Sequence, residues 1–229
     1  MAGERVVLPI FPLGIVLFPG MLLPLNVFED RYRALVRDLL AQPADEGHRF
    51  GVVAIRQGHE VGPDAVSALY DIGTLATVTR VLPRPDGRFE LVTVGTERFQ
   101  LGALDHSKPY LQAEIEILDE QVLAGSDGAE GPAVTDLVAA FRSYVSALGA
   151  ARGTNLQVPD LPKVPALLSW LVAASAVVDL PIRQHLLEID GTVGRLAAEL
   201  ELLRSETNIL KRLGSAPAPY LAHTRQNLN

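Results

Sequence analysis

The clearest hint of catalytic chemistry in this sequence is the pair His59-Glu60, which begins a His-Glu-x-x-His zinc-peptidase motif. In that motif two histidines one helical turn apart bind the metal, and the glutamate activates a water molecule. The second histidine is missing here, because position 63 is Pro63. The five histidines, at 48, 59, 106, 185 and 223, lack metal-ligand spacing, and there is no cysteine. The sequence therefore predicts no metal and no other cofactor.

Patterns that serve nucleotide or ester chemistry are also missing from the sequence. It contains no Gly-x-x-x-x-Gly-Lys-Ser/Thr phosphate loop and no Gly-x-Ser-x-Gly nucleophile elbow. Lys108 and Lys163 adjoin prolines in expected loops, and Lys211 lies close to the C-terminal tail, which does not favour a serine-lysine dyad. We therefore expect no enzyme. A small hydrolase whose site is assembled only in space remains an alternative.

The charge balance bears on the class of partner. Twenty basic and 27 acidic residues give a net charge of -7, which repels phosphate backbones and anionic lipid surfaces. The absence of cysteine fits a reducing compartment, so we expect a cytoplasmic protein. The charge-free run 6–28 is long enough to suggest a membrane span, but Pro9, Pro12, Pro19 and Pro24 interrupt it. Neither nucleic acid nor membrane is an expected partner.

The first half of the chain has the pattern of short strands with one helix. Apolar residues at Tyr32, Leu35, Val36 and Leu39 recur at spacings of three and four, which predicts an amphipathic helix from about residue 29 to residue 40. Strands are expected at 6–11, 22–28, 47–57, 73–82, 89–94, 98–101 and 110–118. Many short strands with one helix predict a closed or partly closed β-barrel.

The second half has the pattern of helices. Helices are expected at 134–148, at 166–178 with apolar residues on every side, from 179, and from 193. In the last helix Arg195 and Glu199 lie one turn apart on what we expect to be a wetter side. Its leucines recur at near-heptad spacing, but the run is shorter than the three or four heptads that indicate a coiled coil, which favours a bundle helix over a coiled-coil dimer. We expect a monomer or a weak homodimer.

These patterns predict an α+β protein with two parts. Residues 1–124 form a β-barrel subdomain with one amphipathic helix, and 133–213 form a helical bundle subdomain. The Gly-, Ser-, Asp- and Glu-rich segment 125–132 reads as a linker or surface loop. Residues 214–229 lack an apolar period and are expected to be a flexible tail.

Several sequence motifs resemble those of a known family. The N-terminal sequence contains LPIFPL at 8–13, VLFPG at 16–20 and LPLNVFEDRY at 23–32, and it resembles the start of the Lon protease substrate-binding domain. Further matches follow in the family's order, at 72–74, 95–99, 110–111, 186–188 and 195–196. The resemblance runs from about residue 6 to residue 206.

The resemblance implies a PUA-like β-barrel followed by a helical bundle, and recognition of unfolded or degron-bearing polypeptides. It covers neither the ATPase module nor the serine-lysine peptidase module of a complete Lon protease. It therefore implies a stand-alone, non-catalytic domain that binds polypeptide clients or a partner protein, as an adaptor or a holdase. Because PUA-like barrels are often associated with RNA, a nucleic-acid-binding protein is the alternative, and the acidic balance opposes it.

The candidate polypeptide-binding residues come mostly from the N-terminal motifs. Their rings could line a groove for apolar side chains, or they could belong to the core of the barrel. Glu29 and Arg31 could orient a ligand or could form a local ion pair at the start of the helix. The candidates are Phe11, Phe18, Pro19, Phe28, Glu29, Arg31, Tyr32 and Arg98.

Overall fold

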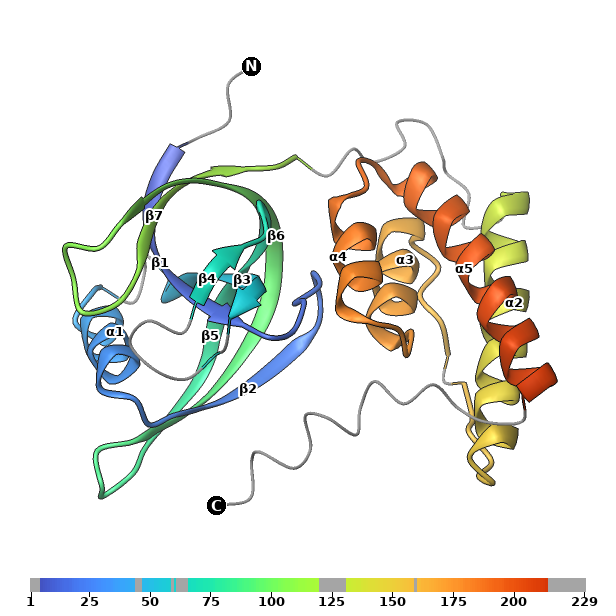
Figure 1. The fold of residues 1–229 in the computed structure, drawn as a ribbon, viewed down its shortest axis with the longest axis horizontal. Helices are drawn as coiled ribbons and strands as arrows, with labels where there is room; N and C mark the ends of the chain where they lie inside the picture. The colour runs from blue at the N-terminus through green and yellow to red at the C-terminus, as the bar shows by residue number, and fades with distance from the viewer. Residues whose placement is uncertain are drawn as a thin grey trace. The chain divides into compact units, whose positions relative to one another are not determined.

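The computed structural model describes residues 5–43, 47–58, 60, 66–119, 131–158 and 160–213. The chain falls into two compact units, Met1–Glu120 and Gln121–Asn229, which we name the β unit and the helical unit (Figure 1). His59, the expected tail at 214–229 and most of the expected linker at 125–132 lie outside the described residues.

The β unit is built around one seven-stranded sheet and one helix. The sheet has the order β1-β7-β6-β5-β3-β4, and β2 pairs with β6. Its elements are β1 (Arg5–Leu13), β2 (Leu22–Val27), α1 (Asp30–Leu40), β3 (Arg49–Gly58), β4 (Val66–Leu69), β5 (Ile72–Pro83), β6 (Phe89–Asp105) and β7 (Gln112–Ile117).

Strand β1 curls the sheet upon itself, because it has a different neighbour along each half. Residues 5–9 pair antiparallel with β7, and residues 10–13 pair parallel with β3. Within the described part of the sheet, β2 and β4 each pair with one neighbour, so two strand edges stay open. A closed barrel has no such edges. Of the expected closed or partly closed barrel, the closed form is therefore wrong.

Two further details of the sheet differ from the sequence expectation. Residues 98–101 are no separate strand but belong to β6, a single strand of 17 residues. Strand β4 was not predicted at all. The first half of β6 pairs with β2 and its second half pairs with β7, while β5 runs along both. Strand β6 therefore supports both halves of the sheet.

The core of the β unit includes two clusters. Helix α1 packs Tyr32, Leu35 and Leu39 against one cluster, which includes Phe11. The other cluster surrounds Phe99 and contains Ile10, Val53, Leu75, Ala113 and Ile115. Gly73 has no side chain, and the ring of Phe99 occupies that space. A Cβ on Gly73 would lie only 2.6 Å from the Cζ atom of Phe99.

The helical unit contains α2 (Pro132–Ala151), α3 (Pro165–Ser175), α4 (Leu180–Glu188) and α5 (Thr192–Leu213). Proline in the first turn of α2, α3 and α4 loses no helical hydrogen bond there and starts each helix. The core includes Leu137, Phe141, Tyr144, Leu168, Leu196, Leu203 and Leu210. No helix in the described part of the chain is long and apolar enough to cross a membrane.

Arg195 and Glu199 on α5 are completely buried, contrary to the wetter side expected for them. The hydroxyl of Ser169 on α3 accepts a hydrogen bond of 2.7 Å from Arg195 Nε and donates one of 2.8 Å to Glu199 Oε1. The Arg195 guanidinium carbon lies 3.3 Å from the ring centroid of Trp170. A hydroxyl and an indole ring of α3 therefore replace the water that these two groups would otherwise keep.

Burial sets the protonation of this cluster. It raises the pKa of Glu199 to about 8, against the opposing effects of the Ser169 hydroxyl and the Arg195 charge. The unfolded chain loses this proton near the ordinary glutamate pKa, while the folded chain holds it to about pH 8. Between these values the folded state binds more protons, so the helical unit loses stability as pH rises.

We predict that Glu199→Gln flattens this pH dependence, because glutamine keeps the size and the Ser169 hydrogen bond but does not ionise. The free energy of unfolding of the wild type should fall by up to about 1.4 kcal/mol per pH unit between pH 5 and pH 8. Urea unfolding followed by Trp170 fluorescence measures this slope. Glu201→Gln, at an exposed position of the same helix, is the matched control and should retain the wild-type slope. Equal slopes in both variants would refute the assignment.

Candidate functional site

The aromatic candidates from the N-terminal motifs lie mainly in the core. The rings of Phe11 and Tyr32 stack with centroids 4.0 Å apart, and Phe50 lies 5.9 Å from Phe11. Phe11, Phe18 and Tyr32 are all buried. Burial raises the pKa of Tyr32 to about 12, so its phenol stays protonated. In this conformation these rings pack inside the core of the β unit and are not part of its exposed surface.

The charged candidates form a local cluster at the start of α1. Arg31 makes an ion pair of 3.0 Å with Glu29, and its guanidinium carbon lies 4.5 Å from the Tyr32 ring centroid. Arg31 also donates a hydrogen bond of 3.0 Å to the Glu60 backbone carbonyl, and the Glu60 carboxylate accepts one from the Gly14 backbone amide. These contacts tie the start of α1 to the end of β1. Arg98, the remaining charged candidate, is buried.

Phe28 is the candidate that is openly exposed, at 48% of its surface, and it continues a pattern in β2. Along this strand Leu23 and Val27 are buried, whereas Leu22 is 63% exposed and Pro24 is also exposed. Alternate residues of a strand face opposite sides of the sheet. Leu22 and Pro24 therefore share one outward face, and Phe28 extends it past the end of the strand.

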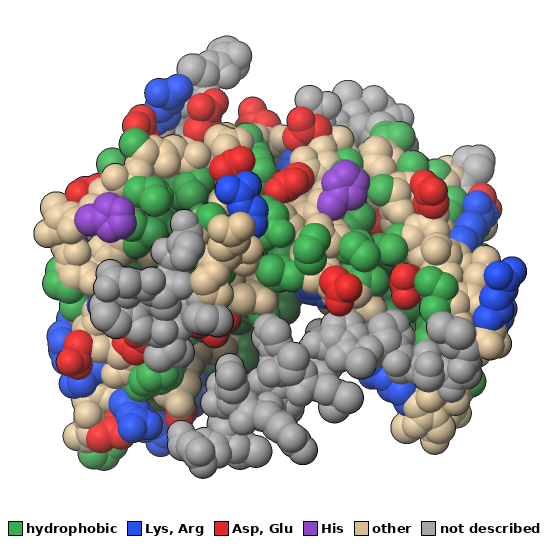
Figure 2. Space-filling model, viewed as in Figure 1, with side chains coloured by type: hydrophobic (Ala, Val, Ile, Leu, Met, Phe, Trp, Pro, Cys, Tyr) green, Lys and Arg blue, Asp and Glu red, His purple; other side chains and the backbone are tan. Residues whose placement is uncertain are grey.

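Neighbouring strands widen this outward face. Val94 of β6 lies opposite Leu22, and Val92 lies opposite Pro24. Leu82 of β5 is paired with Glu90, two residues from Val92, and so faces the same side. We name this surface the β2 face, and it consists of Leu22, Pro24, Phe28, Leu82, Val92 and Val94. Groups of hydrophobic side chains bordered by charged ones are visible on the surface in Figure 2.

Polar groups border the β2 face. Asn26 lies opposite Glu90, and Glu90 accepts a hydrogen bond of 2.9 Å from Arg84 Nε. Arg80 of β5 lies opposite Val92 and is exposed. An apolar centre with a polar border is the composition of a surface that contacts other proteins.

Buried threonines and one glycine position β2. The hydroxyl of Thr74 donates a hydrogen bond of 2.6 Å to the Leu17 carbonyl, and Thr93 donates one of 3.0 Å to the Leu23 carbonyl. The Gly95 amide donates to the Met21 carbonyl at 2.9 Å. A Cβ on Gly95 would collide with the Phe18 carbonyl oxygen, so the loop before β2 approaches β6 as closely as glycine allows.

The site offers apolar contact and little acid–base chemistry. Within the described residues, no group of three or more His, Asp or Glu side chains could hold a metal ion. Among the residues of the β2 face, only Phe28 is a candidate that the sequence predicted. The sequence of 22–28, LLPLNVF, does not alternate between apolar and polar residues, so it does not distinguish Leu22 and Pro24 from the buried Leu23 and Val27.

Comparison with known proteins gives a family match and several relatives. The family model of the ATP-dependent protease La (LON) substrate-binding domain matches residues 7–205. The Lon protease of Anaeromyxobacter dehalogenans is 32% identical over 206 residues, which cover 90% of this chain and 24% of that protein. The Lon protease of Escherichia coli K12 is 25% identical over 219 residues, covering 91% and 26%. The chain thus spans about a quarter of the length of these relatives.

Solved structures share the fold. A Lon N-terminal domain protein from Xanthomonas campestris has a TM-score of 0.60 at 23% identity, covering 87% of this chain and 98% of that chain. The N-terminal domain of the Mycobacterium avium complex Lon protease has a TM-score of 0.56 at 15% identity, covering 89% and 98%. The sheet and the helices described above therefore form a fold that these proteins also have.

We predict that Gly95→Ala destabilises the β unit by about 2 kcal/mol, because the added methyl group pushes the loop before β2 away from β6. Amide hydrogen exchange measures the effect, and the largest loss of protection should fall within 18–27. Gly131→Ala is the control, since a Cβ there has no atom within 4 Å. It should change stability by less than about 1 kcal/mol. Unchanged protection in Gly95→Ala would contradict the role given to this contact.

Proposed function

The chain belongs to the ATP-dependent protease La (LON) substrate-binding domain family, and from this premise we propose that it binds unfolded or degron-bearing polypeptides. Its role would be that of an adaptor or a holdase, with a β unit related to PUA-like domains. Because the matched region is the substrate-binding domain, the proposal assigns binding to these residues and not peptide hydrolysis.

The exposed β2 face is the observation that supports this proposal. A folded protein gains nothing from leaving Leu22 and Phe28 in water, since burial of such a side chain is worth about 1.5–3 kcal/mol. Unfolded polypeptides offer many apolar side chains of different shapes. A flat apolar surface accepts them with little selectivity, whereas a deep pocket would select one.

The backbone of β2 bears on how a polypeptide would lie on this surface. Strand β2 pairs only with β6 among the described strands, so its other edge could receive an extended chain. Pro24 stands in the middle of β2 and has no amide hydrogen to donate. Proline is tolerated in a strand where its nitrogen faces an open edge, which weakens that edge for strand addition. We therefore assign most of the binding to side chains of the β2 face.

The alternative of nucleic-acid binding receives less support. The net charge of -7 repels phosphate, and Arg84, near the β2 face, is already paired with Glu90. An apolar surface with a polar border suits polypeptides better.

We predict that the double variant Leu22→Ser, Phe28→Ser weakens binding of a permanently unfolded, fluorescently labelled protein by about tenfold or more, because two apolar contacts are lost. Fluorescence anisotropy measures the affinity, and mass spectrometry of the client checks that it stays uncleaved.

Leu104→Ser is the matched control for this experiment. Leu104 is 46% exposed and lies in the half of β6 that pairs with β7, away from the partner positions of β2. It should bind the client as the wild type does. Equal affinities of the double variant and the wild type would exclude the β2 face, and no binding by the wild type to several unfolded clients would exclude the proposed function.

A further inference from the structure

Helix α5 carries one polar residue within its apolar stripe. The stripe runs through positions 196, 200, 203, 207 and 210, at alternating spacings of four and three, and each position except Thr207 is a leucine. Thr207 is only 6% exposed. Its hydroxyl oxygen is buried and has no hydrogen-bond partner in the described part of the chain. An unpaired buried hydroxyl lowers stability, so packing alone would favour leucine at this position.

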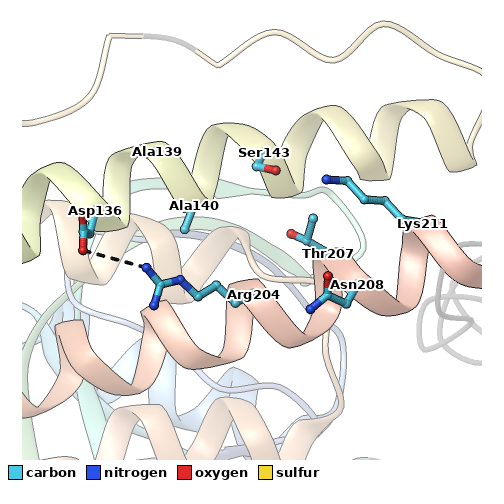
Figure 3. Close-up of a pocket in the computed structure, with 8 residues that line it drawn as sticks. All are labelled: Asp136, Ala139, Ala140, Ser143, Arg204, Thr207, Asn208 and Lys211. Atoms are coloured by element: carbon cyan, nitrogen blue, oxygen red, sulfur yellow. Dashed lines mark ion pairs between the residues drawn. The ribbon is translucent and has the colours of Figure 1, made fainter.

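Helix α2 leaves a space opposite Thr207. Its residues Ala139, Ala140 and Ser143 are small, and together with α5 they border an open groove with a volume of about 420 Å³ (Figure 3). The groove follows from residue choice on both helices, since larger side chains on α2 or a leucine at Thr207 would fill it. Thr207 lines this groove, and its unpaired hydroxyl oxygen is shielded from water beside it.

The charges at the two ends of the groove differ. At one end Arg204 is paired with Asp136 at 3.8 Å. At the other end lies Lys211, for which the described residues provide no ion pair. Figure 3 shows the Lys211 side chain reaching back along the groove toward Ser143, with Thr207 between them. Lys211, Thr207 and Ser143 therefore border this end of the groove, and their ammonium and hydroxyl groups can all donate hydrogen bonds.

We propose that Lys211, Thr207 and Ser143 form a binding site for a carboxylate group in the α2–α5 groove. Lys211 supplies the opposite charge, and the Thr207 and Ser143 hydroxyls supply donors, one of them already desolvated. A carboxylate fits better than a phosphate dianion, because Lys211 is the one positive charge in the groove that has no ion pair among the described residues. Arg204, which is paired with the Asp136 carboxylate, shows the same chemistry at the other end.

A structural role for Lys211 alone would explain less. Lys211 lies in the last turn of α5, where a positive charge interacts favourably with the helix dipole. That interaction needs neither the small residues of α2 nor a buried hydroxyl. The carboxylate site accounts for all three features. It uses residues of the helical unit only, so it stands independently of binding at the β2 face.

Three probes test the site and identify the source of the carboxylate. The full chain is titrated with sodium acetate, with an amidated peptide that contains glutamates, and with a glutamine version of that peptide that has a free C-terminus. Sodium chloride keeps the ionic strength constant. The Ala140 and Thr207 methyl signals in NMR spectra report binding. We expect saturable shifts with at least one probe, and the peptide that binds tells a side-chain carboxylate from a C-terminal one.

Variants then decide between a site and a nonspecific charge effect. Lys211→Met should weaken binding about tenfold, whereas Lys163→Met, which removes the same charge from an exposed position of the same unit, should not. Thr207→Val should also weaken binding while it raises the midpoint of thermal unfolding, because a methyl group replaces the unpaired hydroxyl. The absence of saturable shifts with all three probes, or equal affinities of Lys211→Met and Lys163→Met, would overturn the proposal.

Discussion

The parallel pairing of β1 with β3 is the constraint on which the β unit depends. Antiparallel neighbours can be joined by a short hairpin, but a parallel pair needs a long crossover connection. Here the crossover spans 14–48 and contains β2 and α1. Within this crossover, helix α1 covers the core with Tyr32 and Leu35. Strand β2, also within it, pairs with β6. The exposed β2 face is thus carried by the same connection that the β1–β3 pairing requires.

Two of the short motifs that resemble the family serve this connection and do not themselves form the exposed surface. Thr74 and Gly95 belong to two such motifs, and both are buried beneath the loop that leads into β2. Thr74 donates to the Leu17 carbonyl, and Gly95 permits the close approach of Phe18. A motif of small and hydroxylated residues therefore marks where two backbone segments meet.

Local patterns could be predicted from the sequence, and contacts between elements could not. Helix α1 has its own apolar spacing and was predicted within one residue at its start. The burial of Arg195 and Glu199 depends on Ser169 of another helix, so no pattern within α5 reveals it. At the candidate site, aromatic residues such as Phe11 drew attention because rings occur both in cores and in binding surfaces. Leu22 lies in a nearly continuous apolar run, so its outward position appears only when β2 is paired with β6.

The two proposed surfaces share one physical property, which is a residue of the wrong polarity for its position. Leu22 is apolar on the outward side of β2, and Thr207 is polar on the inward side of α5. In most proteins the polarity of each residue suits its place in the fold, with apolar residues inside and polar residues outside. Residues that break this rule without stabilising the structure are expected at functional sites. Glu199 also departs from its pattern, but Ser169 bonds its carboxylate within the core. The hydrogen bond from Ser169 to Glu199 Oε1 holds α3 to α5, so this polar group contributes to the fold. The Thr207 hydroxyl makes no hydrogen bond within the described residues, and the Leu22 side chain is exposed to water, so a ligand would supply a contact to each.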